Sequence, residues 1–329
     1  MHAPATGRRR RAPDPHRHPV TAPDGRPPGT RTGTGSATGT APVPLAYTDT
    51  GPPPGRPHAP TVVLGHGLLF GGWMFRPQTE ALRAEYRCVS PDWRGQGDSP
   101  VTPGGYDMDT LTADTLALIT ALDTGPVHFV GLSMGGFVGL RLAARHPERV
   151  RSLTLLATTA DGLPAHRARL FRQFAAVSRL VGPAPVRRQA AALAFGGSFR
   201  ASGRSGPVLA EWHRHLRRGD RVGIARAARA VADHPSVAAE LPRITAPALV
   251  LVGAEDVSTP VDDSRRLAAR LSDARLTVLD GAGHTPTLEQ PAAVTGHLRA
   301  FLTEIDHRPA DDPHDPRHPD PRHPDRPHR

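Results

Sequence analysis

The chain has 329 residues, 38% of them hydrophobic, which is enough for a sizeable globular core. Its formal net charge is +10, but aromatic residues make up only 5% of the chain and no known nucleic-acid-binding motif is present, so we expect no nucleic-acid partner. Every basic residue other than histidine is arginine, and the lack of lysine excludes pyridoxal-phosphate Schiff bases and the P-loop lysine.

Proline-rich tails are predicted at both ends. Residues 1–42 hold mainly Arg, Pro, Gly and Thr, and residues 306–329 repeat Pro, His, Asp and Arg. Neither segment has enough apolar surface to offset the entropy that ordering would cost, so both are predicted to be disordered. The histidines of the second tail have no fixed geometry, and we expect no metal site there.

The lack of a complete export signal, of a membrane span and of a cysteine pair predicts a cytoplasmic protein. The four arginines at residues 8–11 resemble the start of a signal peptide, but no apolar segment follows them. No window approaches the ~18 apolar residues of a membrane span, so we expect no membrane interaction. Cys88 is the only cysteine, which excludes an intramolecular disulfide, and its apolar surroundings predict that it is buried.

Strand-like and helix-like patterns alternate between the tails. Apolar, β-rich runs predict strands at Thr61–Gly65, Arg87–Asp92, Val127–Gly131, Ser152–Ala157, Ala248–Gly253 and Arg275–Asp280. Helical patterns separate most of these runs. The alternation favours an α/β fold with a mostly parallel, doubly wound sheet, whose core would comprise residues 43–159 and 242–305.

The interval of residues 160–241 has no convincing strand. It is rich in Ala and Arg and contains helical stretches such as "AHRARLFRQFAAVSRL" and "RVGIARAARAVADH". We predict a helical cap inserted at the edge of the sheet. An arginine of this cap could bind a substrate carboxylate, although solvated helix faces are the simpler interpretation.

Ser133 lies in the segment Gly131–Gly135, which matches G-x-S-x-G between a predicted strand and a predicted helix. Small residues at Gly131 and Gly135 allow the strand and helix to pass closely, and the serine would project from the carboxyl edge of the sheet, where ligands bind. A simple helix N-cap is the alternative, but it would not need the flanking glycines. We therefore predict that Ser133 is a nucleophile.

A serine nucleophile needs a base and a carboxylate. His284 lies in a glycine-flanked loop after the last predicted strand and is the expected base. Asp256 follows the preceding strand and is the expected acid, because it would emerge at the same edge of the sheet as Ser133. Asp161, which follows an earlier strand, is the competing acid.

Two backbone N–H groups are predicted to bind the developing oxyanion. One belongs to Met134, directly after the nucleophile. The other belongs to Leu68 in the loop "GHGLLFGGW", with Leu69 as the near alternative. His66 in the same loop is expected to hold the loop backbone, because His284 already occupies the position of the base.

Five segments together resemble the α/β-hydrolase fold superfamily, in its esterase, enol-lactonase and cofactor-free haloperoxidase-like branch: "GHGLLF", "PDWRGQGDS", "VGLSMGGFVGLRLAARHPERVRSLTLLAT", "LVLVGAEDVSTP" and "LDGAGHTPTLEQP". The resemblance covers about residues 46–303. It implies a Ser–His–Asp hydrolase without a cofactor, with a helical cap over its pocket. The chain departs from the family at its start, where only "PLAYTDTG" stands in place of the usual two-stranded hairpin. The first strand is either missing or contained in the tail-like sequence.

The sequence thus predicts a serine hydrolase that cleaves a carboxylic ester or lactone of a small molecule through an acyl-enzyme. Perhydrolase or haloperoxidase-like activity and carbon–carbon bond hydrolysis use the same residues and stay open, whereas a non-catalytic ligand-binding role is less favoured. Leu69, Phe70 and Trp73 are candidate pocket residues, although Phe70 and Trp73 fit the core equally well, and Trp212 is assigned to neither. The natural substrate and the oligomeric state are left open.

Overall fold

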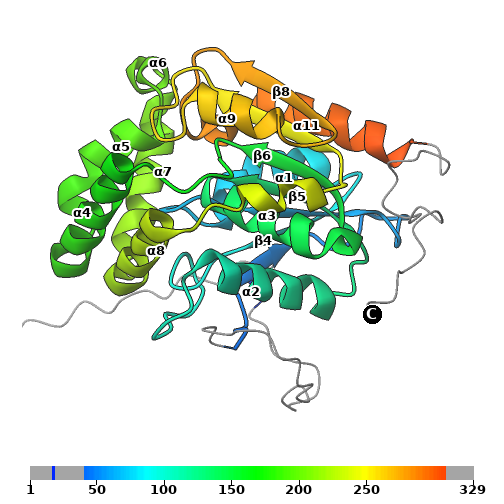
Figure 1. The fold of residues 1–329 in the computed structure, drawn as a ribbon, viewed down its shortest axis with the longest axis horizontal. Coiled ribbons are helices and arrows are strands. Elements are labelled where there is room, and N and C mark those ends of the chain that lie inside the picture. Colours follow the sequence, from blue (N-terminus) through cyan, green and yellow to red (C-terminus); the bar gives the residue numbers. More distant parts are fainter. Residues whose placement is uncertain (1–16, 19–40, 309–329) are drawn as a thin grey trace, which may run out of the picture.

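The computed structural model describes residues 17–18 and 41–308, and Figure 1 shows their fold. Most of the residues assigned to the two predicted tails lie outside the described residues. None of the described helices contains an apolar stretch of the length that a membrane span requires.

An eight-stranded sheet forms the centre of the molecule, with the strand order β1-β2-β4-β3-β5-β6-β7-β8. β2 pairs antiparallel with β1 on one side and with β4 on the other. From β4 through β3, β5, β6 and β7 to β8, every pairing is parallel. All six predicted strands are present, with ends shifted by no more than two residues. The strands are β1 (Arg17–His18), β2 (Tyr47–Asp49), β3 (Thr61–Gly65), β4 (Arg87–Pro91), β5 (Val127–Leu132), β6 (Val150–Leu156), β7 (Ala248–Gly253) and β8 (Ala274–Leu279).

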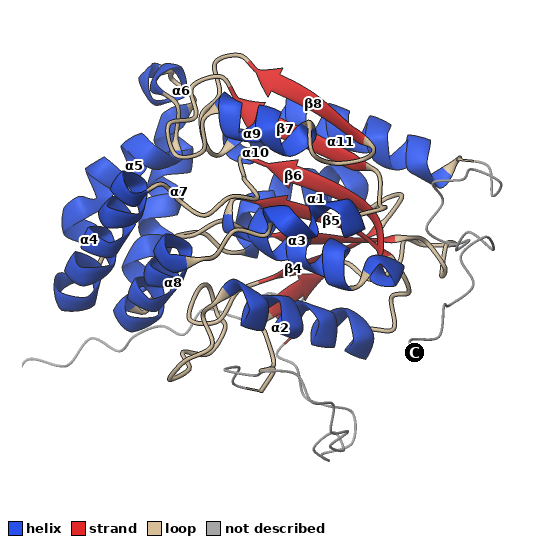
Figure 2. Ribbon diagram, in the orientation of Figure 1, coloured by secondary structure: helices blue, strands red, loops and turns tan. Residues whose placement is uncertain are grey.

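Helices cover both faces of this sheet (Figure 2). One face packs against α2 (Met108–Ala121), α3 (Met134–Arg145) and α9 (Val261–Ala268), and the other against α1 (Arg76–Leu82) and α11 (Pro291–Asp306). Because both faces are covered, the central strands β3, β5 and β7 are buried along their whole length, which explains their continuous apolar runs. The doubly wound arrangement that the sequence predicts is confirmed.

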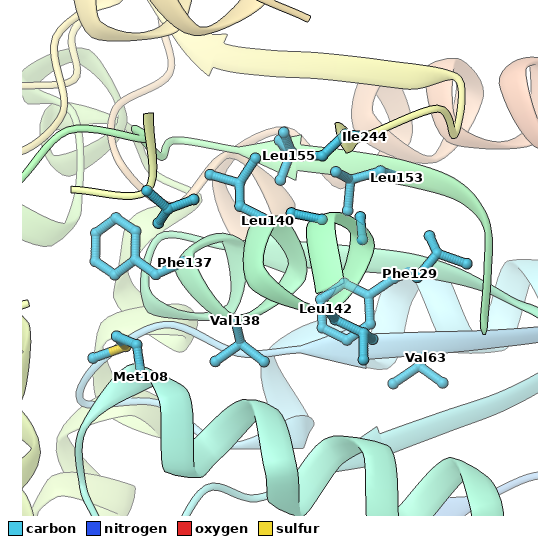
Figure 3. Packing of buried hydrophobic residues seen from close by; sticks show 14 of the residues in the cluster. Val63, Met108, Phe129, Phe137, Val138, Leu140, Leu142, Leu153, Leu155 and Ile244 are labelled. Atoms are coloured by element: carbon cyan, nitrogen blue, oxygen red, sulfur yellow. The ribbon is translucent and has the colours of Figure 1, made fainter. Parts of the chain in front are cut away.

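Helix α3 packs between α2 and the sheet (Figure 3). Its residues from Met134 to Ala144 are all buried, as expected for a helix that is apolar nearly all round. Figure 3 shows Val138 directed toward α2 and Leu140 directed toward Leu155 of β6. Each such side chain contributes about 2 kcal/mol through burial, so the start of α3 is held firmly against the end of β5.

The interval predicted as a cap consists of helices and loops and lies at one end of the molecule, on the left in Figure 1. The chain enters and leaves it at neighbouring points, because the N–H of Val237 donates to the carbonyl of Ala160 over 2.8 Å. Helices α4 and α8 pack against each other within it. The cap helices are α4 (Ala165–Val181), α5 (Arg187–Ala194), α6 (Gly197–Ala201), α7 (Ser205–Arg218) and α8 (Arg221–Asp233).

At the first edge of the sheet, the structure places the outer strand within the tail-like sequence, which is one of the two alternatives that the sequence left open. The segment "PLAYTDTG" contains β2, which pairs with β4 on one side. On its other side it pairs with β1, from within the predicted N-terminal tail. The antiparallel strand pair expected at this edge is therefore present, but its outer strand comes from a segment without an apolar pattern.

The predicted start of the second tail at Asp306 is wrong. Helix α11 continues through Asp306, whose carboxylate accepts hydrogen bonds from the ring of His128 over 3.2 Å and from Arg151 over 2.8 Å. Arg308 contacts Asp273 over 2.9 Å. These contacts join segments far apart in the sequence, so the local composition around Asp306 carries no sign of them.

Candidate active site

A pocket of about 230 Å³ lies between the cap and the carboxyl edge of the sheet. Helices α4, α5 and α8 contribute to one side, and the loop after β3 and the turn between β5 and α3 contribute to the other. Ser133, Ser258 and His284 all line it. Most of the remaining lining is apolar, including Leu170, Phe171, Phe174, Val177, Ala190 and Leu193.

Ser133 occupies the turn between β5 and α3 in a strained conformation. Its φ is 51° and its ψ is −110°, in a region that residues other than glycine seldom adopt. The turn is possible because two neighbours lack side chains: a Cβ on Gly135 would lie 2.0 Å from the carbonyl oxygen of Gly65, and one on Gly131 would lie 2.4 Å from that of Gly135. The predicted close approach of strand and helix is thus confirmed.

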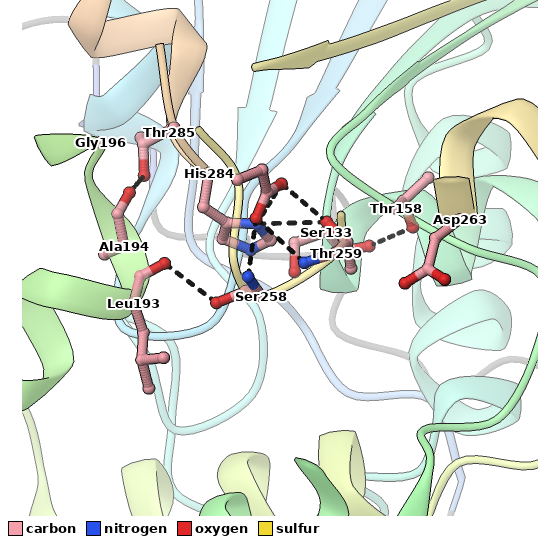
Figure 4. Close-up of polar contacts among 12 residues, drawn as sticks. Ser133, Thr158, Leu193, Ala194, Gly196, Ser258, Thr259, Asp263, His284 and Thr285 are labelled. Carbon is pink, nitrogen blue, oxygen red and sulfur yellow. Dashed lines mark hydrogen bonds and ion pairs between the residues drawn. The ribbon is translucent and has the colours of Figure 1, made fainter. Parts of the chain in front are cut away.

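The ring of His284 donates from Nδ1 to the carboxylate of Asp256, whose Oδ2 lies 2.9 Å away and whose Oδ1 lies 3.0 Å away. Figure 4 shows the polar contacts around this ring. The N–H groups of Ser258 and Thr259 donate to Oδ1 over 2.8 Å and 2.9 Å, and the Thr259 hydroxyl donates to Oδ2 over 2.8 Å. Because an ionised carboxylate only accepts, the ring carries its proton on Nδ1, and Nε2 is left to act as an acceptor.

Ser133 and His284 line the same pocket, but no hydrogen bond joins the hydroxyl to the ring among the described residues. The carbonyl of Ser133 accepts from the hydroxyl of Thr158 over 2.9 Å, as Figure 4 shows. Contacts between a nucleophile and its base often tighten only in the complex with substrate. The structure therefore brings the three predicted side chains to one site, where Asp256 and His284 are hydrogen-bonded and Ser133 and His284 are not.

The two predicted oxyanion donors border this site. Met134 is the first residue of α3, so its N–H has no partner within the helix. Leu68 lines the pocket together with Ser133. The carbonyl of Gly67 accepts from the ring of His66 over 2.7 Å, and since the C=O and N–H of a trans peptide point in opposite directions, the N–H of Leu68 is directed away from that ring.

The rest of this loop serves as a scaffold. His66 is fully buried, and its Nε2 accepts from the N–H of Trp93 over 2.9 Å while its Nδ1 donates to Gly67. Burial lowers the pKa of His66, which agrees with a neutral ring that has one donor and one acceptor. The N–H of Leu69, the alternative oxyanion donor, donates to Oε1 of Gln96 over 3.0 Å.

Glu289 holds the loop that carries His284, a role that the sequence patterns above did not predict. Its carboxylate accepts from the N–H groups of Gly283, Thr285 and Gly196 over 2.8 Å, 2.9 Å and 2.9 Å. The side chain is fully buried, and this burial raises the pKa of Glu289 despite the three donors. Only its place in the segment "GHTPTLEQP", five positions after the histidine, could have suggested it.

Asp161, the competing acid, pairs elsewhere. Its carboxylate lies 3.3 Å from the guanidinium of Arg270 and 3.9 Å from that of Arg266. Asp256 is the carboxylate that contacts His284.

The predicted pocket residues divide into two groups. Leu69 and Phe70 line the pocket. Of the two alternatives for Trp73, the structure favours the core: its ring stacks on the ring of His215, with centroids 4.5 Å apart and planes 6° apart, and it packs in the core. Trp212 is likewise fully buried in the core. Aromatic residues in this region thus join the cap to the body of the protein as well as shaping the pocket.

Charged side chains have little part in the pocket. No arginine is among its described lining residues, and the cap residue Arg167 pairs with Asp263 over 2.7 Å. Within residues 17–18 and 41–308, no three His, Cys, Asp or Glu side chains are grouped so that they could hold a metal ion. The site therefore offers an apolar wall beside a hydroxyl, an imidazole and backbone N–H groups.

Known proteins resemble both the sequence and this architecture. A family model described as the alpha/beta hydrolase fold matches residues 60–291. A protein of Pseudomonas syringae pv. syringae named "Putative carbamate hydrolase RutD" is 33% identical over 248 residues, which are 74% of this chain and 94% of that protein.

Two solved structures extend the comparison. The esterase of Thermogutta terrifontis superposes with a TM-score of 0.73 at 29% identity, covering 82% of this chain and 96% of its own. The enol-lactonase of Burkholderia xenovorans LB400 superposes with a TM-score of 0.72 at 30% identity, covering 79% of this chain and 97% of its own. With the family model and the sheet topology, these matches establish that the chain belongs to the α/β-hydrolase fold family and is a hydrolase.

Proposed function

We propose that the chain is a serine hydrolase that cleaves a small ester or lactone with an uncharged, apolar acyl group through an acyl-enzyme. One observation carries this proposal: Ser133, held in a strained turn, shares its pocket with His284, whose ring is fixed by Asp256. Solved relatives named as an esterase and an enol-lactonase support the choice of an ester or lactone.

The first half of the reaction forms the acyl-enzyme. Nε2 of His284 accepts the proton of Ser133 as the hydroxyl oxygen attacks the carbonyl carbon, and Asp256 stabilises the resulting imidazolium. The oxyanion of the tetrahedral intermediate accepts hydrogen bonds from the N–H groups of Met134 and Leu68. The imidazolium then protonates the leaving oxygen; the alcohol of an ester departs, whereas the hydroxyl released from a lactone stays attached to the acyl group.

The second half repeats these steps with water. His284 accepts a proton from the water as its oxygen attacks the acyl carbon, and the same N–H groups stabilise the second oxyanion. The proton returns to the oxygen of Ser133, the carboxylic acid leaves, and the enzyme is restored. The protein supplies every group that these steps need.

The lining of the pocket supports an uncharged acyl group. Its side walls come mainly from aliphatic and aromatic residues of α4 and α5, and none of its described lining residues is arginine. A carboxylate buried there without a cationic partner would lose several kcal/mol of hydration free energy. An aliphatic acyl chain instead gains free energy by leaving water.

The test is turnover by the wild type and by Ser133→Ala of three substrates: p-nitrophenyl hexanoate, its hemisuccinate analogue and an aryl carbamate. We expect hydrolysis of the hexanoate, slower hydrolysis of the hemisuccinate by about tenfold or more, and a loss of about 10⁴-fold or more in kcat for Ser133→Ala. An alkyl phosphonate should label Ser133 in the wild type. Equal turnover by both proteins would overturn the proposal, and a preference for the carbamate would replace the proposed substrate class.

A further inference from the structure

The last turn of α5 is bonded to both loops that carry the predicted acid and base. The carbonyl of Leu193 accepts from the hydroxyl of Ser258 over 2.9 Å, and the carbonyl of Ala194 accepts from the hydroxyl of Thr285 over 2.5 Å. Figure 4 shows both bonds. Carbonyls in the last turn of a helix have no donor within the helix, so these two hydroxyls complete the end of α5.

The two hydroxyls belong to residues that also hold the acid and the base. The N–H of Ser258 donates to Oδ1 of Asp256 over 2.8 Å. Thr285 follows His284 directly, and both Thr285 and Ser258 are nearly or fully buried. A shift of the end of α5 would therefore move the supports of both catalytic loops at once.

The chain just after α5 makes the same connection through its backbone. Gly196 donates its N–H to Glu289, which also holds the residues on either side of His284. The approach is so close that a Cβ on Gly196 would lie 2.8 Å from the backbone nitrogen of Gly283. The link between the cap and the base loop is therefore tight and permits little independent movement.

The same end of α5 faces the pocket. Leu193 and Ala194 line it together with Ser133, Ser258 and His284. An acyl chain that fills the pocket would contact Leu193 and Ala194, whose carbonyls are bonded to the two catalytic loops. No hydrogen bond joins Ser133 to His284 among the described residues, so this is the contact that such a link could close.

We propose that Thr285 and Ser258 are positioning residues that couple acyl-chain binding in the pocket to the alignment of His284 and Asp256. This inference rests on the proposed function. A hexanoyl chain that packs against the last turn of α5 shifts it together with the two loops bonded to it, and this joint shift brings the imidazole to the position where Nε2 accepts the proton of Ser133. An acetyl group is too short to use this link. Binding energy from a remote part of the substrate is thereby used at the reacting carbon.

The test compares p-nitrophenyl hexanoate with p-nitrophenyl acetate in Thr285→Val, which removes the hydroxyl and keeps the shape. We expect kcat/KM for the hexanoate to fall about fivefold to tenfold, through kcat, while the value for the acetate changes by less than about twofold. Thr285→Ser should restore the wild-type ratio of kcat/KM for the hexanoate to kcat/KM for the acetate. Ser258→Ala should lower this ratio, as Thr285→Val does. Thr115→Val is the matched control, because it removes a fully buried hydroxyl bonded to the carbonyl of Leu111 over 2.8 Å in α2.

Several outcomes would overturn the inference. Equal losses for both esters in Thr285→Val and Ser258→Ala would show that the hydroxyls only stabilise the fold, and so would failure of Thr285→Ser to restore the ratio. If Thr285→Val does not fold, the inference is decided by the hexanoate-to-acetate ratio of kcat/KM in Ser258→Ala and in Thr285→Ser. If hydrolysis requires Ser133 but the ratio never changes, this inference alone fails; if hydrolysis does not require Ser133, the proposed function fails with it.

Discussion

Nδ1 of His284 donates to Oδ2 of Asp256 across 2.9 Å, although 28 positions separate the two residues. The topology explains the contact: β7 and β8 are paired in parallel, with Gly253 opposite Leu279, so the loops that follow them start side by side. Asp256 lies in the first of these loops and His284 in the second. Ser133 follows β5, two strand positions from β7, and meets them at the same edge.

Replacement of the proposed acid in Asp256→Asn is expected to lower kcat by about 10⁴-fold, because the amide can no longer hold the imidazole with its proton on Nδ1. Hydrolysis of p-nitrophenyl hexanoate measures the effect, and the thermal midpoint checks the fold. Asp161→Asn is the control, since its carboxylate pairs with Arg270 and should be dispensable for activity. A larger loss in Asp161→Asn than in Asp256→Asn would reassign the acid.

Gly135→Ala tests the close packing behind Ser133. The added Cβ would lie 2.0 Å from the carbonyl oxygen of Gly65, so the start of α3 must move away from β3. We expect a loss of about 2–3 kcal/mol in the free energy of unfolding, measured with urea, together with reduced activity. Gly296→Ala is the control: it lies in α11 with no atom within 4 Å of an added Cβ, and it should stabilise the protein by about 0.5–1 kcal/mol. Similar urea midpoints of unfolding for Gly135→Ala and Gly296→Ala would contradict the packing argument.

Short-range patterns were sufficient to predict much of the fold. The parallel strands follow from apolar runs that are buried on both faces. The turn at Ser133 follows from its flanking glycines, because a Cβ at either position would clash with the backbone. The choice of Asp256 over Asp161 rested on the usual placement of the acid in the family that the sequence resembles, and the pairing of β7 with β8 places the loop of Asp256 beside that of His284.

Contacts between distant segments could not be predicted in the same way. Trp73 fits a pocket or a core equally well by its chemistry, and only the position of His215 in the cap decides that it stacks there. Asp306 resembles the tail that follows it, yet it pairs with Arg151 and His128 across the fold. Glu289 is one acidic residue among many until three backbone N–H groups converge on it.

The carboxylate of Asp306 predicts a pH dependence of stability. Burial alone would raise its pKa, but the contacts with His128 and the hydrogen bond from Arg151 outweigh burial and lower the pKa to about 2. Because the folded-state pKa lies below the unfolded value, the carboxylate stabilises the fold above about pH 4, and this contribution is lost as the pH falls toward 2. We expect Asp306→Asn to cost about 1–2 kcal/mol of unfolding free energy at pH 7.

The measurement is urea unfolding of the wild type and Asp306→Asn between pH 7 and pH 2. The difference between the two proteins should shrink as the pH falls through this range. Asp262→Asn provides the control, because that exposed carboxylate pairs with Arg265 at the surface and should contribute much less. A difference that stays constant down to pH 2 would show that the contacts of Asp306 do not depend on its charge.

The final prediction concerns the apolar part of the pocket. Ala190 lines it from α5 and is 6% exposed, so Ala190→Phe places a ring where the acyl chain is proposed to bind. We expect kcat/KM for p-nitrophenyl hexanoate to fall about tenfold or more while that for the acetate changes by less than about threefold. Ala192→Phe, on the exposed side of the same helix, should leave both values unchanged. Equal losses for the two esters in Ala190→Phe would mean that the acyl chain binds elsewhere, because a ring in its path must discriminate against the longer chain.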